Sequence, residues 1–195
     1  MDGALIGARR LVAAAALGSA AGVALVVLFT IVPPPWDALV NTSALWGLVP
    51  FAVAARSPHG RGVAVGVASM LALVLVWILL SPNVITVREV LVFVLVLVLV
   101  GLGAGAVCGA AGAAVGRDRR VSGTVVVAGI VLGEAVYGTV VVGGPHWFVE
   151  AALAGILVPA CCRTAATRVR AGLGAAAVAG ALFGAYWAYD AVLTT

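Results

Sequence analysis

The chain has 195 residues, of which 64% are apolar and only 9% charged, and its mean hydropathy is +1.24. A water-soluble fold cannot bury that much apolar surface, so the composition predicts an integral membrane protein. Each membrane-spanning helix takes about 20 residues, so seven spans would use roughly 140. The remainder excludes a separate soluble catalytic, ATP-binding or nucleic-acid-binding domain, and we expect a single transmembrane domain over residues 1–195.

The first apolar run, 11–32, is longer than the apolar region of a cleaved signal peptide, and it ends at Pro33, Pro34 and Pro35, which cannot continue a helix. The predicted fold is an all-α, polytopic transmembrane helical bundle. Six spans remain the alternative, if the polar run 38–55 or the Ala/Gly-rich run 171–193 does not insert. The seven predicted spans are 11–32, 38–55, 62–80, 90–115, 122–142, 146–162 and 171–193.

All 11 basic residues are Arg, against seven acids, and the net charge is +4. The Arg are scattered through short loops rather than gathered on one face, which indicates topology signals and no nucleic-acid partner. With the N-terminus inside, ten Arg lie on the inner side and only Arg88 lies outside. This split predicts a cytoplasmic N-terminus and an outer C-terminus. The Ala, Val and Gly content is typical of a GC-rich genome, which favours a bacterial plasma membrane.

Aromatic residues are expected near the outer ends of the spans, where they would form an interfacial belt. These residues are Trp36, Trp77, Trp147, Phe148, Tyr186, Trp187 and Tyr189.

Small residues recur every four positions on several predicted spans, which lets helix backbones approach closely. One series is Ala14, Gly18 and Gly22. The most specific series begins with Gly101, Gly105 and Gly109, and then runs on through Gly112 and Gly116. Two interpretations stay open: packing within the bundle, or a docking face for a partner membrane protein.

Glu134 is the acid that most needs an explanation, because it lies about 12 Å inside its span at 1.5 Å per residue. A carboxyl group at that depth is costly unless it is protonated, partnered or facing a wet cavity. Tyr137 lies one turn outward on the same face. Glu134 therefore either makes a structural hydrogen bond within the bundle or belongs to a binding site.

Further outward-side residues can reach the same region, and with Glu134 and Tyr137 we expect Asn41, His146, Tyr186 and Asp190 to bind a ligand. Five acids against one Arg make the outer half electronegative, which favours a small cationic or amphipathic ligand entering an outward-facing acidic and aromatic pocket. The wider set of outward polar residues comprises Asp37, Asn41, Thr42, Glu89, His146, Glu150, Tyr186, Tyr189 and Asp190.

The chain offers little for catalysis or metal binding. His59 and His146 are far apart, and the three Cys form no ligand cluster with them. There is no phosphate-binding loop and no nucleophile–base triad, and no acid evidently matches the depth of Glu134 to form a carboxylate pair. We therefore expect no enzyme activity, no metal and no cofactor.

Two short segments, 41–46 (Asn-Thr-Ser-Ala-Leu-Trp) and 132–138 (Leu-Gly-Glu-Ala-Val-Tyr-Gly), resemble a family of uncharacterised small multi-pass membrane proteins from high-GC Gram-positive bacteria. That resemblance implies a topology and no substrate. The ridge of Ala14, Gly18 and Gly22 is more loosely similar to the substrate-binding subunits of energy-coupling-factor transporters, which dock a membrane partner.

Two functional hypotheses follow. The protein is either a small-molecule binding or transport subunit, or a structural or assembly protein that docks a membrane partner through its Gly/Ala helix faces.

Overall fold

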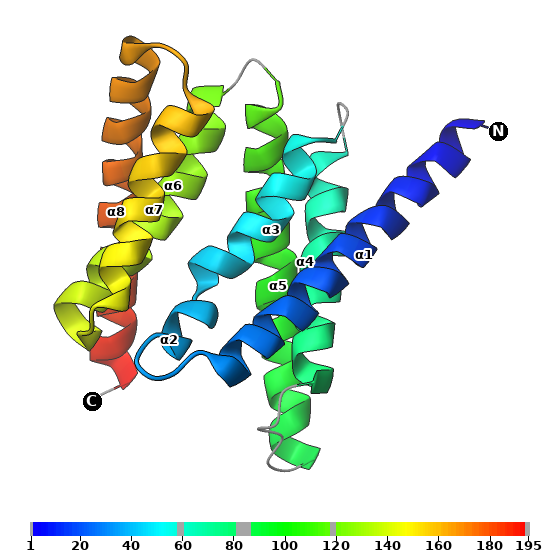
Figure 1. Cartoon of the computed structure of the whole chain (residues 1–195), viewed down its shortest axis with the longest axis horizontal. Helices are drawn as coiled ribbons and strands as arrows, with labels where there is room; N and C mark the ends of the chain where they lie inside the picture. Colours follow the sequence, from blue (N-terminus) through cyan, green and yellow to red (C-terminus); the bar gives the residue numbers. More distant parts are fainter. Residues whose placement is uncertain (1, 58–60, 81–86, 118–119, 194–195) are drawn as a thin grey trace.

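The computed structural model describes residues 2–57, 61–80, 87–117 and 120–193, and the elements in these ranges are helical, which confirms the all-α prediction. Successive long helices run antiparallel, so the chain passes up and down the bundle (Figure 1). The elements are α1 (Asp2–Ile31), α2 (Asp37–Val40), α3 (Ser43–Ala55), α4 (Gly62–Leu80), α5 (Val87–Val115), α6 (Arg120–Tyr137), the π-helix η1 (Gly138–Val142), α7 (His146–Cys161) and α8 (Ala165–Leu193).

Five stretches of the described residues are long and apolar enough to cross a membrane, which is compatible with a multi-pass membrane protein. Two further apolar helical stretches are shorter, at Gly101–Val115 and His146–Cys161. The five long stretches are Gly7–Ile31, Asp37–Ala55, Gly62–Leu80, Arg120–Val142 and Ala165–Ala188.

Two predicted boundaries are corrected. The run 38–55 is not one helix but two, because the backbone is extended at Thr42. The expected loop 163–170 is mostly helical, since α8 begins at Ala165. Thr164 starts it: its Oγ1 accepts from Thr167 N at 3.2 Å, and Thr167 Oγ1 accepts in return from Thr164 N at 3.2 Å. This reciprocal capping stabilises a helix start inside an Arg-rich segment.

The bundle has two groups of helices and two distinct ends. Helices α1, α3, α4 and α5 form one group, and α6, α7 and α8 form the other, with α3 and α5 both contacting α6 (Figure 1). We call the end where α3 finishes and α6 begins the arginine end, because it carries Arg10, Arg56 and Arg120. The opposite end, where α3 begins and α7 starts, is the acidic end.

Glycines bring α4 and α5 into backbone contact, as the series of Gly101, Gly105 and Gly109 predicted. A Cβ atom added to Gly109 would lie 2.5 Å from Gly62 O and 2.9 Å from Gly66 Cα. The ridge on α1 is also used within the chain, because a Cβ on Gly22 would lie 2.9 Å from Leu73 O of α4. These two small-residue faces therefore serve bundle packing.

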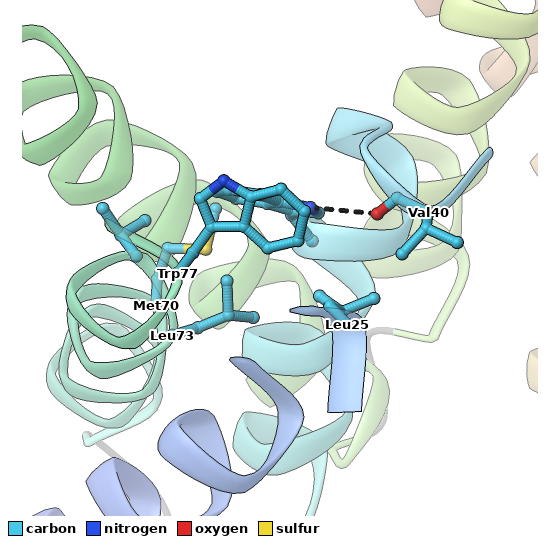
Figure 2. Packing of buried hydrophobic residues seen from close by; sticks show 7 residues of the cluster. Leu25, Val40, Met70, Leu73 and Trp77 are labelled. Atoms are coloured by element: carbon cyan, nitrogen blue, oxygen red, sulfur yellow. Dashed lines mark hydrogen bonds between the residues drawn. The ribbon is translucent and has the colours of Figure 1, made fainter. Parts of the chain in front are cut away.

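An aromatic and aliphatic core joins α1, α3 and α4 at the acidic end. Figure 2 shows Leu25, Leu73 and Trp77 turned toward one another. The Trp77 ring is 5.0 Å from that of Trp46, between centroids, and is 7% exposed. Trp77 is therefore a core residue, and its assignment to an interfacial belt was wrong, because position on a span does not say which side of the helix a ring occupies.

Candidate functional site

The site begins with a break between α2 and α3. Thr42 adopts an extended conformation, with φ −83° and ψ 145°, and its side chain caps α3 by accepting from Leu45 N at 3.4 Å. The break leaves the carbonyl of Val40 without a helical donor, and the indole of Trp46 donates to it at 3.3 Å. The break also presents the free amide groups of the first turn of α3 to the bundle, where they need acceptors.

Glu134 of α6 supplies those acceptors. Its Oε1 accepts from Ser43 N at 3.0 Å, while Oε2 accepts from Ala44 N at 2.7 Å and from Ser43 Oγ at 2.6 Å. A carboxylate is stabilised at a helix N-terminus by the free amide groups and by the helix dipole. Three hydrogen bonds across 90 residues of sequence therefore hold α6 against α3. The expected hydrogen bonding of Glu134 within the bundle is observed.

Glu150 of α7 is a second acid, and it lies within electrostatic range of Glu134. Its residue is 0% exposed, and neither of its oxygens has a hydrogen-bond partner in the described part of the chain. Glu134 and Thr42 are the polar groups whose electrostatic influence reaches it, and the hydroxyl of Thr42 donates to Leu39 O at 3.0 Å. Buried carboxyl groups without partners are rare, because their loss of water is uncompensated.

His146 lies one turn before Glu150, on the same face of α7. It is 4% exposed, and neither ring nitrogen has a partner among the described residues. The imidazole packs on Trp147, with 4.4 Å between ring centroids, and lies beside Gly144. Gly143 and Gly144 have φ of +81° and +114°, a backbone that favours glycine and turns the chain from η1 into α7. This turn places His146 and Glu150 beside α6.

Tyrosines of α6 and α8 complete the site. The rings of Tyr137 and Tyr186 are 5.0 Å apart between centroids, tilted by 39°. Tyr186 also lies within electrostatic range of Ser43, Glu134 and Glu150. Side chains of α3, α6, α7 and α8 therefore converge at the acidic end. We call this group the polar cluster: Thr42, Ser43, Glu134, Tyr137, Glu150 and Tyr186.

The structure brings three of the six expected ligand-binding residues together, namely Glu134, Tyr137 and Tyr186. The ring of His146 instead contacts Trp147 and lies beside Gly144. Asn41 is exposed and makes no side-chain hydrogen bond to the described residues, although it lies next to Thr42. Asp190 falls in α8, but its side chain lies outside what the structure describes.

Sequence reasoning did not select Glu150 or Ser43 as ligand-binding residues. The sequence offered no evident acid to match Glu134 in depth, and Glu150 is the acid that comes within electrostatic range of it. The four-residue spacing of His146 and Glu150 was the available signal, since it puts both on one helix face. Ser43 carried no such signal, because its role depends on α6.

The polar cluster combines negative charge with the faces of aromatic rings, and this combination decides which ligands it can bind. Within the described residues, no group of three or more His, Cys, Asp and Glu side chains is arranged to hold a metal ion. Two carboxylates flanked by tyrosine rings suit an organic cation or a proton. A cavity of about 210 Å³ lies instead near the arginine end, beside Arg10 and Arg56.

No curated protein and no solved structure matches this chain. A family model does match it, over residues 2–192. The chain therefore belongs to DUF6518, a family of unknown function.

Proposed function

We propose that the acidic end binds a small organic cation, and that the protein acts in the membrane as a small-molecule binding or transport subunit. The observation that carries this proposal is Glu150, a fully buried carboxyl group whose two oxygens both lack a partner in the described structure. A cation beside it would supply the missing counter-charge and relieve its repulsion with Glu134.

The two carboxylates would have different roles. Glu134 already accepts three hydrogen bonds from α3, so it fixes the geometry of the site and adds negative charge. Glu150 has both oxygens available and would contact the cation directly. The rings of Tyr137 and Tyr186 offer faces that attract cations, an interaction of about 0.5–2 kcal/mol. This arrangement favours an alkylammonium or phosphonium over a small metal ion.

The proposed topology has seven crossings in a bacterial plasma membrane, with a cytoplasmic N-terminus. The alternating directions of the helices and the ten-to-one distribution of Arg support it. The acidic end then faces outward, so the cation would arrive from outside. No step of this proposal involves enzyme activity, a metal or a cofactor.

An assembly role is the second candidate, and one observation favours it. Helix α8 carries small residues at four-residue intervals, and a Cβ atom added to Gly172, Gly180 or Gly184 would meet no atom within 4 Å. Ala176 lies between them on the same face and is exposed. Such a face lets a second transmembrane helix approach closely. The comparable faces of α1 and α5 are already occupied, by α4 and, at Gly112 and Gly116, by α3.

Binding of tetraphenylphosphonium to the purified protein, measured by isothermal titration calorimetry in detergent, tests the cation proposal. We expect Glu150→Gln to weaken the affinity about tenfold, which corresponds to about 1.4 kcal/mol. The matched control is Asp37→Asn, which removes an acid at the same end outside the polar cluster. Equal affinities for the wild type and Glu150→Gln would remove Glu150 from the site. Self-association that is lost in Gly180→Leu would favour the assembly role instead.

A further inference from the structure

The cavity near the arginine end combines positive charge with apolar walls. It has a volume of about 210 Å³ and lies between α1, α3 and α4. Its polar lining comes from Arg10, Arg56 and Ser57, and no acid among the described residues contributes to it. A third guanidinium lies nearby, since a Cβ atom on Gly7 of α1 would be 2.6 Å from Arg61 Nη1. The cavity therefore has a positive rim.

Arg10 and Arg56 line the cavity itself: Arg10 lies on α1, Arg56 directly follows α3, and both are exposed. Arg56 follows the last turn of α3, where its charge also complements the free carbonyls of the helix end. The hydroxyl of Ser57 donates to Val53 O at 3.2 Å, which leaves its oxygen able to accept. Guanidinium groups bind phosphate oxygens in a planar, two-pronged geometry that a lysine cannot provide.

Below the rim, the walls are apolar. Ala13, Leu17 and Val53 line the cavity, and Leu17 lies about 10 Å along α1 from Arg10, at 1.5 Å per residue. Leu17 is 54% exposed, so this wall opens sideways, toward the surface that lipid would cover. The cavity thus has charge at its end and hydrocarbon along its length, in the order in which a phospholipid presents its headgroup and acyl chains.

We propose that this cavity binds an anionic phospholipid, with the phosphate between Arg10 and Arg56 and the start of an acyl chain along Ala13, Leu17 and Val53. Basic pockets between transmembrane helices on the cytoplasmic side favour anionic headgroups, through both charge and hydrogen bonding. The apolar wall separates this ligand from a free phosphate ester, which would leave that wall without a partner.

Native mass spectrometry of the full chain in mild detergent tests this site, with phosphatidylglycerol and phosphatidylcholine as competing lipids. We expect the wild type to retain phosphatidylglycerol roughly 10- to 30-fold better, as about 1 kcal/mol per arginine implies. The double variant Arg10→Gln/Arg56→Gln should bring the ratio close to one. The matched control is Arg9→Gln, an exposed neighbour on α1 that does not line the cavity, and it should retain the preference.

A second variant leaves the charges in place. Ala13→Phe should fill the cavity and reduce retention of phosphatidylglycerol several-fold, and it should fold because Ala13 is exposed. Glycerol 3-phosphate serves as a water-soluble competitor that has the phosphate but no acyl chain. It should displace phosphatidylglycerol poorly even at millimolar concentration. Effective competition by glycerol 3-phosphate would overturn the lipid assignment in favour of a free phosphate ester. Equal retention of both lipids, or the same loss in Arg9→Gln as in the double variant, would overturn the site itself.

Discussion

The contact between α4 and α5 and the polar cluster both hold helices together, but by opposite means. At the first, glycines let two backbones touch, and nothing larger fits. At the second, a helix is interrupted so that its first amide groups can bind the carboxylate of Glu134. The first contact depends on shape along a continuous helix face, while the second depends on single polar atoms. The first should therefore be the more sensitive to added volume, and the second to lost charge.

The largest expected effect is at the glycine contact. A Cβ atom on Gly105 would lie 2.9 Å from Val67 Cα and 2.9 Å from Met70 Cβ, so Gly105→Leu should lower the free energy of unfolding by about 3 kcal/mol. Gly103→Leu is the control on the same helix, because a Cβ there meets nothing within 4 Å. Thermal unfolding in detergent measures both, and similar melting temperatures for the two variants would contradict close packing.

Loss of the Glu134 carboxylate should have the next largest effect. Glu134→Ala leaves Ser43 N and Ala44 N without acceptors, and should lower the free energy of unfolding by about 2 kcal/mol. Glu134→Gln should recover part of this loss, since its oxygen still accepts. Val136→Ala, an exposed position on the same helix, is the control for the thermal unfolding measurement. If Glu134→Ala is no less stable than that control, the carboxylate does not hold α3.

Substitution of Glu150 should stabilise the protein, in contrast to substitution of Glu134. Glu150→Leu removes a buried carboxyl group that has no partner in the described structure, and should raise the free energy of unfolding by about 1 kcal/mol. Thermal unfolding and tetraphenylphosphonium binding are measured together, because stability should rise while binding falls. Val149→Leu, on the exposed side of α7, should change neither. A loss of stability in Glu150→Leu would show that this carboxyl group has a partner after all.

The smallest expected effect concerns Tyr186. Tyr186→Phe removes a hydroxyl within electrostatic range of Ser43 but keeps the ring against Tyr137, so stability should fall by only about 0.5 kcal/mol. Chemical denaturation in mixed micelles can resolve such a change. Trp187→Phe, which alters an exposed ring beside it, is the reference. A loss above about 1.5 kcal/mol would mean that the hydroxyl, rather than the ring, holds α8.

The two regions also differ in how far the sequence predicts them. The glycines of α5 recur at a helical interval, so their close contact follows from local spacing, and α4 matches its predicted bounds of 62–80. The contact between Ser43 and Glu134 could not be predicted in this way, because it joins residues 91 positions apart. In the sequence, the break between α2 and α3 was visible only as a low hydropathy of the run 38–55. The helix start itself could not be predicted, because its amide groups depend on an acceptor from another helix.

Trp77 is a second residue whose position along the helix could be predicted but whose neighbours could not. Hydropathy places it correctly near the end of α4, but it does not predict that the ring lies on the side of α4 that faces α1 and α3. Which side chains of a helix become buried depends on which other helices pack against it, and a single sequence does not show which helices are neighbours. For Glu150, the four-residue spacing to His146 predicts that the two residues share one face of α7. The spacing does not predict that Glu150 comes within electrostatic range of Glu134.

The hydrogen bonds between Glu134 and the start of α3 also determine when, during synthesis, α3 can reach its final position. The chain emerges from the ribosome with α3 first, and at 5–20 residues per second Glu134 follows roughly 5–18 s later. During that interval the first amide groups of α3 have only water or lipid headgroups to bind, and hydrocarbon offers them nothing. We therefore expect the second hydrophobic segment to wait near the membrane surface or the insertion machinery, and to settle at its final depth only when α6 arrives.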